Sequence, residues 1–559
     1  MTRFSWRVWG ALFLLLLPAR AVWCAEPLVM KSMEQEMQRS MKKLQFEEFK
    51  TPYFLAYRLI DARRSSLAAR YGAIVQNQNT RNRFLYVELR YGTYDFDNTD
   101  QNFQGYFESA ALDEDGEALR HRLWLLTDRA YKDSINSYLI KQGKKISEME
   151  KERVADFSRE TPQVHAGPLA ESEQGLDFYA DALRKASLLF RSNKEILDSG
   201  LTLNKSRSLN YYLNSEGAKI VSFSEANPYY LYLWAEAQAL DGMGVSVART
   251  FSARKTNDLP GDAELKNSVD EMVGDLLRLR NALLSNPYTG PAILDSESTG
   301  VLFHEAVGHR LEGERLRDSE EGQTFKGQVG KKIIPGFITV TDNPALDNYL
   351  GVSLNGYYPY DDEGVPSQAV VLVEDGVLKN YLMSRRPIQG FAHSNGHGRA
   401  QFGRDPIGRM SNLFVKSSKG IADKKLKELL LQECKRQGKP YGLWIRRTRS
   451  GDTYTGRAQY QAFRGTPEEV YLIDVKTKQE TLVRGVEIVG TPLITINKIL
   501  AMGTDYQVMN AFCQAESGSI PVSTIAPSVL VKEVELQRVK EDKKRPPILM
   551  PPLFANKEE

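Results

Sequence analysis

The chain has 559 residues, which exceeds what one hydrophobic core usually holds and predicts two or more domains. Its 42% hydrophobic and 26% charged residues are typical of a soluble globular protein. The 74 Lys and Arg residues nearly balance the 71 Asp and Glu residues, so the net charge of +3 gives no indication of nucleic acid or another acidic partner.

The first residues have the layout of a secretory signal peptide. Arg3 and Arg7 precede an apolar run over residues 8–17, and Pro18 breaks this run before Ala19-Arg20-Ala21. The run is too short to span a bilayer comfortably, and small residues at the first and third positions of the last triplet are typical of a cleavage site.

We therefore expect residues 1–21 to be removed and the mature chain to start at Val22, without a transmembrane segment. The protein is then expected to be exported, to a bacterial periplasm. A lipoprotein anchored at Cys24 is the alternative, which the bulky side chain of Trp23 disfavours.

Helical and extended segments alternate through the first half of the mature chain. Apolar residues at helical spacing predict an exposed amphipathic helix over 26–45, and aromatic and β-branched runs predict three strands, over 53–60, 71–75 and 84–91. Further helices and strands are expected over 123–157, 174–195, 208–213, 218–224, 230–238 and 264–284. Together these elements predict a mixed α+β domain over residues 22–285.

Short apolar runs separated by turn signals dominate the second half. A turn-rich stretch over 286–291 opens it, and Glu374-Asp375-Gly376 between two apolar runs predicts a hairpin. We expect a β-rich domain over 286–530 that carries a few helices, one of them with the metal site. Residues 531–559 are rich in Lys, Glu and then Pro, so they are expected to form an extended surface tail.

The most informative motif is His304-Glu305-Ala306-Val307-Gly308-His309, which is one residue longer than the zinc-protease signature H-E-x-x-H. Histidines bind zinc, and a nearby glutamate such as Glu305 can act as the general base. On a regular helix His304 and His309 would point roughly 140° apart. A widened turn with i to i+5 bonding reduces this to about 50°. The motif therefore predicts a distorted helix, which Gly308 would tolerate.

Two histidines leave a catalytic zinc one protein ligand short. Cys513 is the candidate for this ligand, because it lies among small and polar residues ahead of a strand-like run. Two alternatives remain open for this cysteine. It is either a buried apolar thiol or one half of a disulfide with Cys434 in an oxidising compartment.

Several motifs in order resemble the TldD/PmbA family of metalloproteases. The stretch 299–314 is followed by Asp361-Asp-Glu-Gly, then Ser394-Asn-Gly-His-Gly-Arg, then Pro406-x-x-Arg409-x-Ser-Asn412. The resemblance is to the TldD branch, because the partner branch lacks the H-E-x-x-x-H ligands. It implies an N-terminal α+β domain and a β-rich C-terminal domain.

The resemblance also implies one Zn²⁺ per active site, held by His304, His309 and Cys513. It further implies two-fold pairing, with a second copy or a paralogue, around a chamber that admits unfolded peptides. The export signal, the longer first half and the Pro-rich tail depart from the familiar members, so their natural substrates are not carried over.

Other polar residues near these motifs have two interpretations each. His397 and Arg399 either contact the substrate backbone or its oxyanion, or they stabilise a glycine-rich turn. Asp361-Asp362-Glu363 lacks the spacing of a calcium loop and is expected to be a turn lining the cleft. For Glu312 and Glu314, exposed helix charges are favoured over carboxylates that orient a ligand histidine.

The sequence thus predicts an exported zinc peptidase in which Glu305 activates the metal-bound water for attack on a peptide carbonyl. Unfolded peptides or small proteins are the expected substrates, bound extended against a strand edge. The alternative is a non-catalytic periplasmic peptide-binding or assembly subunit of the same fold, with Cys434 and Cys513 bridged.

Overall fold

The structure is a computed structural model that describes residues 27–100, 105–147, 154–167, 175–317, 323–453, 463–490, 492–539 and 543–554. The expected signal peptide over 1–21 and Cys24 lie outside the described residues. Within those ranges, no helix combines the length and the apolar character needed to cross a membrane.

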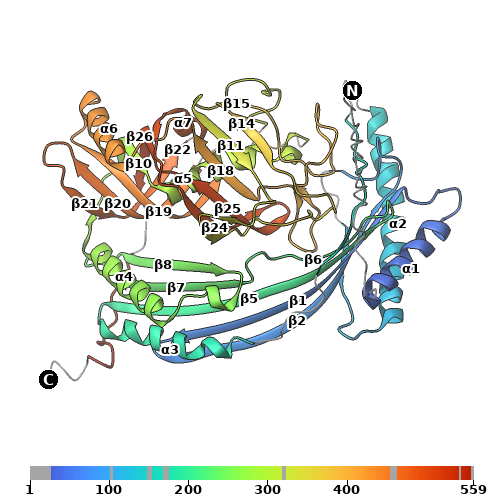
Figure 1. Cartoon of the computed structure of the whole chain (residues 1–559), viewed down its shortest axis with the longest axis horizontal. Coiled ribbons are helices and arrows are strands. Elements are labelled where there is room, and N and C mark those ends of the chain that lie inside the picture. The colour runs from blue at the N-terminus through green and yellow to red at the C-terminus, as the bar shows by residue number, and fades with distance from the viewer. Residues whose placement is uncertain are drawn as a thin grey trace, which may run out of the picture.

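A long sheet, antiparallel except for the parallel pairing of β4 with β6, forms most of the first half of the molecule. Its strands run in the order β3-β2-β1-β5-β6-β4, and β7 pairs with β5 and β8. The bounds are β1 Phe54–Arg70, β2 Ala73–Arg90, β3 Tyr106–Ser109, β4 Val164–Ala166, β5 Ile196–Asn214, β6 Lys219–Phe223, β7 Tyr229–Gln238 and β8 Gly244–Ala253. Figure 1 shows the sheet as a curved layer that runs along the molecule, with the second half of the chain on one face.

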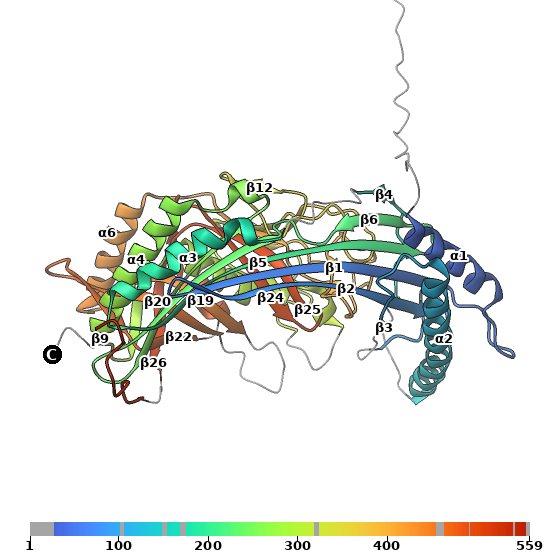
Figure 2. The same cartoon turned by 90° about the horizontal axis from the view of Figure 1, so that it is seen from below.

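Four helices cover the two ends of this sheet. Helices α1 (Leu28–Lys43) and α2 (Gly116–Ser147) pack at one end, and α3 (Ala180–Leu189) and α4 (Asp262–Asn281) at the other (Figures 1 and 2). The amphipathic helix expected over 26–45 is confirmed as α1, which exposes its polar face and buries its apolar one. Met30, Met33 and Met37 are buried in a core with β1 and β2, because the period of 3.6 residues aligns them.

The strand expected over 71–75 is also corrected. Tyr71 and Gly72 have φ angles of 48° and 87° and form the tight turn between β1 and β2, and β2 begins at Ala73. Two consecutive residues with positive φ suit a two-residue hairpin, because that turn matches the right-handed twist of its strands. The separate runs expected over 53–60 and 84–91 are therefore parts of one long hairpin.

Two sheets form the second half. An eight-stranded sheet has the order β19-β10-β26-β22-β20-β21-β9, in which β9 is Leu283–Leu284, and its eighth strand β23 (Ile499–Met502) pairs with β26. A six-stranded sheet has the order β15-β14-β11-β18-β25-β24. The principal bounds are β10 Tyr288–Leu294, β11 Ile338–Asp342, β14 Val370–Glu374, β15 Val377–Leu378, β18 Asn412–Ser417, β19 Tyr441–Thr453, β20 Phe463–Asp474, β21 Glu480–Arg484, β22 Val486–Gly490, β24 Gln507–Ala515, β25 Gly518–Ala526 and β26 Val529–Arg538. The expected α+β class with a β-rich second half is confirmed.

Strand β26 corrects the expected start of the C-terminal tail at residue 531. Val529–Arg538 pairs with β10 on one side and β22 on the other, so these residues lie in the middle of a sheet. Alternating buried side chains such as Val534 and Leu536 explain the strand, which the dense Lys and Glu residues concealed. Residues 543–554 lie on the surface, where Lys544 N–H donates to the carbonyl of Gly242.

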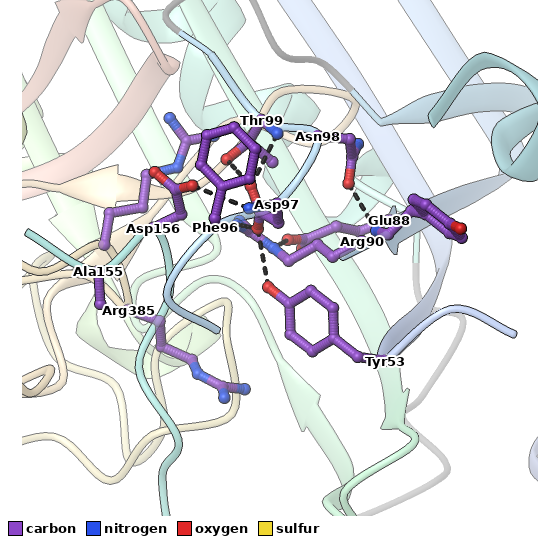
Figure 3. Close-up of polar contacts among 12 residues, drawn as sticks. Tyr53, Glu88, Arg90, Phe96, Asp97, Asn98, Thr99, Ala155, Asp156 and Arg385 are labelled. Carbon is purple, nitrogen blue, oxygen red and sulfur yellow. Dashed lines mark hydrogen bonds and ion pairs between the residues drawn. The ribbon is translucent and has the colours of Figure 1, made fainter. Parts of the chain in front are cut away.

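A buried polar network connects the first sheet to the second half. Nη1 of Arg90 lies 3.0 Å from Oδ2 of Asp97, and the Tyr53 hydroxyl donates to the same oxygen at 2.7 Å (Figure 3). The Phe157 ring contacts two guanidinium groups, at 3.7 Å from Arg90 and 4.1 Å from Arg385 of the second half. Through the Phe157 ring, these contacts connect the end of β2 to the second half of the chain, which carries the H-E-x-x-x-H motif.

Candidate metal centre

The H-E-x-x-x-H motif lies in a short helix that changes its period. Helix α5 (Ser296–Phe303) begins after Asp295, whose side chain accepts the Ser298 N–H, as N-cap residues do. It continues as a π turn over His304–Gly308 and ends in a 3-10 turn over His309–Leu311. The His309 N–H donates to the His304 carbonyl, which is the i to i+5 bond of a widened turn. The predicted distortion is confirmed.

Two neighbours stabilise this turn. The guanidinium of Arg310 is buried and donates from Nη1 to the carbonyls of Glu305, at 2.7 Å, and Ala306, at 3.3 Å. Gly308 has ordinary right-handed angles, so the turn does not need its conformational freedom. A Cβ atom there would instead overlap Sδ of Met410, which packs directly on the turn. The glycine therefore serves close packing, which corrects the expected reason for it.

The widened turn brings both histidines of the motif to Cys513. Nε2 of His304 lies 3.1 Å and Nε2 of His309 lies 3.4 Å from Sγ of Cys513, which is on β24. The three donor atoms lie within 4.8 Å of one another, and all three residues are buried. A tetrahedral zinc ion, about 2.0–2.3 Å from each donor, separates its donors by about 3.3–3.6 Å. The three side chains thus fit a zinc-sized ion.

The electrostatics of this cluster favour the ligand form of the cysteine. Burial opposes ionisation of Cys513, but the neighbouring His309 and His304 outweigh it and hold the pKa of the thiol well below its ordinary value. The thiolate is the form that binds metal ions. Cys434 is different, because its burial among apolar side chains raises the pKa of its thiol to about 11. Both cysteines are free, so the disulfide considered from the sequence is not formed.

Glu312 orients the second motif histidine, contrary to the expectation of an exposed charge. Nδ1 of His309 donates to Oε2 of Glu312 at 3.1 Å, and Nε of Arg315 donates to the same oxygen at 2.9 Å. Burial alone would raise the pKa of Glu312, but the charges of His309 and Arg315 hold it well below the ordinary value. A carboxylate on the far nitrogen fixes the ring and leaves Nε2 for a metal ion. Glu314 instead pairs with Arg386 at 2.9 Å.

The donor atoms face a cavity of about 430 Å³. Glu305 lines it, with its carboxylate 4.0 Å from Nε2 of His309. The other lining residues come from helix α5, from the 3-10 turn over Gly313–Leu316, from the end of β19 and from the β24–β25 hairpin: Val301, Arg315, Arg449, Ser450, Gly451, Met509, Ala511, Phe512, Gln514, Ala515, Glu516 and Val522. Strand β24 is the edge strand of its sheet, with β25 as its one partner among the described strands.

His397 and Arg399, which were expected to contact the substrate, do not line this cavity. His397 is fully buried, with Nε2 3.2 Å from Oδ1 of Asp342. Arg399 donates to the carbonyl of Pro521 at 2.9 Å and stacks on the Tyr358 ring. Both side chains have protein partners that hold loops of the second half together, which matches the structural interpretation of this glycine-rich turn.

The Asp361-Asp362-Glu363 turn is likewise internal and does not line the cleft. Asp361 accepts the backbone N–H groups of Glu363 and Gly398. Asp362 pairs with Arg58 of β1 at 2.7 Å, so the turn joins the second half to the first sheet. The glycine-rich sequence indicated a turn, but its burial depends on the contact with β1.

Sequence reasoning assigned no role to two arginines beside the site. Arg310 directly follows the motif, and Arg409 lies in the quoted stretch Pro406-x-x-Arg409. Neither arginine is exposed. The one signal in the sequence was that each arginine lies in or next to a quoted motif. Their hydrogen-bond acceptors are mostly backbone carbonyls, which a sequence pattern does not reveal.

Comparison with known proteins places this site within a family. Residues 287–538 match the family model of the PmbA/TldA metallopeptidase C-terminal domain. A metalloprotease of Archaeoglobus fulgidus is 30% identical over 298 residues, which cover 52% of this chain and 64% of that protein. A zinc metalloprotease TldD homolog of Saccharolobus solfataricus is 24% identical over 402 residues, which cover 71% of this chain and 78% of that protein. The match to the Archaeoglobus relative thus spans slightly less than two thirds of its length.

Solved structures share the fold of the whole chain. A proposed modulator of a DNA gyrase from Thermotoga maritima superposes with a TM-score of 0.60 at 16% identity and covers 91% of this chain and 99% of its own. TldE from Thermococcus kodakarensis superposes with a TM-score of 0.58 at 15% identity and covers 90% and 99%. The matched C-terminal domain, which contains all three donor residues, and the curated metalloprotease relatives relate this chain to the TldD/PmbA family, and the solved structures share its fold.

Proposed function

We propose that the protein is a zinc-dependent peptidase with one Zn²⁺ per active site. The observation that carries the proposal is the convergence of His304, His309 and Cys513 on one point of a cavity that Glu305 also lines. When bound there, zinc would polarise a peptide carbonyl and lower the pKa of a coordinated water. Three protein ligands leave the fourth position open, as in catalytic zinc sites.

Glu305 is the proposed general base. Its carboxylate lines the cavity beside Nε2 of His309, where it can take a proton from water and deliver it to the leaving amine. Its place within the π turn, next to His304, fixes its distance from the ligand atoms. Arg310 holds the Glu305 carbonyl, which keeps this segment of backbone in place.

Strand β24, which lies at the edge of its sheet among the described strands, is the proposed binding surface for the substrate. Unpaired backbone N–H and C=O groups of an edge strand can pair with an extended peptide, with little dependence on the side chains of that peptide. Cys513 lies on this strand, so a peptide paired there would pass the donor atoms. This supports unfolded peptides or small proteins as the substrate class.

A non-catalytic peptide-binding or assembly subunit of the same fold is disfavoured, because its bridged cysteines are not found and the donor set is complete. Export to the periplasm and two-fold pairing with a second copy or a paralogue belong to the proposal. They rest on the N-terminal sequence and on the family resemblance.

The test is the substitution Glu305→Gln, which keeps the size of the side chain but removes the base. Loss of a positioned general base typically lowers the rate by about 10²–10⁴-fold. We expect hydrolysis of an unfolded peptide to fall by that factor, while the zinc content stays at one per chain. Glu374→Gln makes the same chemical change at an exposed position at the end of β14, outside the cavity, and should keep full activity. A fully active Glu305→Gln protein, or a wild-type protein that binds no zinc, would refute the proposal.

A further inference from the structure

Arg409 is a fully buried arginine that contacts both parts of the chain that supply the metal donors. It follows the short strand β17 (Ile407–Gly408), and its own backbone N–H donates to the carbonyl of His397. The backbone of Arg409 is therefore held in place within the second half, and the residue does not line the cavity.

One end of the guanidinium meets the carboxylate that orients His309. Nε of Arg409 lies 3.2 Å from Oε1 of Glu312, as an ion pair whose N–H is not aligned for a hydrogen bond. The other oxygen of Glu312 accepts from Nδ1 of His309. Both side chains of the ion pair are fully buried, so solvent screens this charge contact little.

The other two nitrogens hold the hairpin that carries Cys513. Nη2 donates to the carbonyl of Cys513 itself at 2.9 Å. Nη1 donates to Oγ of Ser517 at 2.7 Å and to the carbonyl of Gly518 at 3.1 Å, in the turn between β24 and β25. All the nitrogens of one planar group are thus directed either to Glu312 or to this hairpin.

We infer that Arg409 is a positioning residue that holds the Glu312–His309 pair and the Cys513 hairpin at a fixed separation, so that their donor atoms are preorganised for one metal ion. The inference rests on the proposed metal site. A lysine would keep the charge, but its single ammonium group on a flexible stem cannot meet Glu312 and both hairpin carbonyls in a fixed geometry.

The test compares metal binding by the full-length wild type, Arg409→Lys and Arg385→Lys. Arg385 is the matched control, because it is equally buried and donates to the Ser158 carbonyl but contacts none of the donors. Zinc affinity is measured by competition with a chromophoric chelator, and the absorption spectrum of the Co²⁺-loaded protein reports the ligand geometry. Loss of a residue behind the ligands typically weakens metal binding by about 10–100-fold. We expect that loss and a changed Co²⁺ spectrum for Arg409→Lys, with wild-type values for Arg385→Lys.

The inference is overturned if Arg409→Lys keeps the wild-type affinity and spectrum, or if Arg385→Lys weakens binding equally. Glu312→Gln provides a second route if Arg409→Lys does not fold, because it breaks the same connection from the histidine side. Wild-type affinity in that variant overturns the inference as well. A wild-type protein that binds neither Zn²⁺ nor Co²⁺ refutes the proposed function and this inference together, whereas an unchanged Arg409→Lys protein refutes the inference alone.

Discussion

His309 and Cys513 are 204 positions apart in the chain, yet Nε2 of one and Sγ of the other lie 3.4 Å apart. The histidine directly follows a π turn, and the cysteine lies on an edge strand near the C-terminal end of the second half. The donor set therefore exists only after the sheets of this half have assembled, and metal binding should be coupled to its folding.

The two cysteines should respond differently to the same substitution. Cys513→Ser replaces a thiolate with a hydroxyl, which is a poor zinc ligand, so we expect the zinc content after dialysis against a chelator to fall to near zero. Cys434→Ser is the matched control, because Cys434 is equally buried but lies in a separate apolar cluster with Leu430 and Ile293. Elemental analysis of both variants checks this. Equal zinc contents would remove Cys513 from the donor set.

Gly308→Ala should destabilise the protein through Met410. The added Cβ would overlap Sδ of Met410, and overpacking of this kind typically costs about 1–3 kcal/mol. We expect a lower melting temperature and weaker zinc binding, because the strained turn carries both histidines. Met410→Ala in the same chain opens space for the methyl group, so the double variant should lose less than the sum of the single losses. Additive losses would show that the overlap is relieved elsewhere.

A feature of this site could be predicted from the sequence where it depends on neighbouring residues in the chain, and could not where it depends on distant ones. The spacing of His304 and His309 determines the angle between them around a regular helix. Because that angle is too large for one metal ion, a widened turn could be predicted from these two residues alone. The role of Gly308 was misjudged because its partner Met410 is about a hundred positions away. The burial of Glu312 was missed for the same reason, since its counterions come from Arg409 as well as from Arg315.

The same distinction holds for the fold. The hairpin at Glu374-Asp375-Gly376 follows from local turn chemistry, and β14 and β15 pair across it as expected. The hairpin at Tyr71-Gly72 was divided into separate strands, because Tyr71 is not a typical turn residue. Strand β26 was taken for tail because its Lys and Glu residues suggested solvent, whereas only its alternate side chains face the core.

Stability should fall with rising pH because of a buried carboxyl group. Burial and the neighbouring Asp361 raise the pKa of Glu363 well above its ordinary value of 4.5. The folded protein therefore keeps a proton on Glu363 at a pH where the unfolded chain has lost it. Where the folded state binds more protons, the free energy of unfolding decreases as pH rises, by up to about 1.4 kcal/mol per pH unit for one proton.

Glu363→Gln tests this dependence. The glutamine has no ionisable proton, and its carbonyl oxygen can still accept the Arg385 backbone N–H that Glu363 accepts at 2.7 Å. Melting temperatures of both proteins between pH 6 and 8.5 are the measurement, with the metal site unchanged in each. We expect a smaller decrease with pH in the variant. Identical slopes would mean that Glu363 ionises as readily in the folded protein as in the unfolded chain.

The buried pair of Arg90 and Asp97 should matter far more for stability than an exposed pair. Arg90→Met leaves the Asp97 carboxylate, which is fully buried, without its guanidinium, and breaking a buried pair typically costs about 3–5 kcal/mol. The substitution also removes the contact between Arg90 and the Phe157 ring. We therefore expect a large decrease in melting temperature and weaker attachment of the first sheet to the second half.

Two further variants separate the buried charge from the lost packing. Arg90 also pairs with the buried Glu88 at 2.6 Å, so the double variant Arg90→Met and Asp97→Asn removes one of two uncompensated carboxylates and should recover part of the loss. Arg184→Met breaks the exposed pair with Asp181 and should change the stability by about 0.2–1 kcal/mol at most. If Arg90→Met lowered the stability no more than Arg184→Met, solvent would have to reach Asp97. The contacts drawn in Figure 3 would then contribute less to stability than their burial indicates.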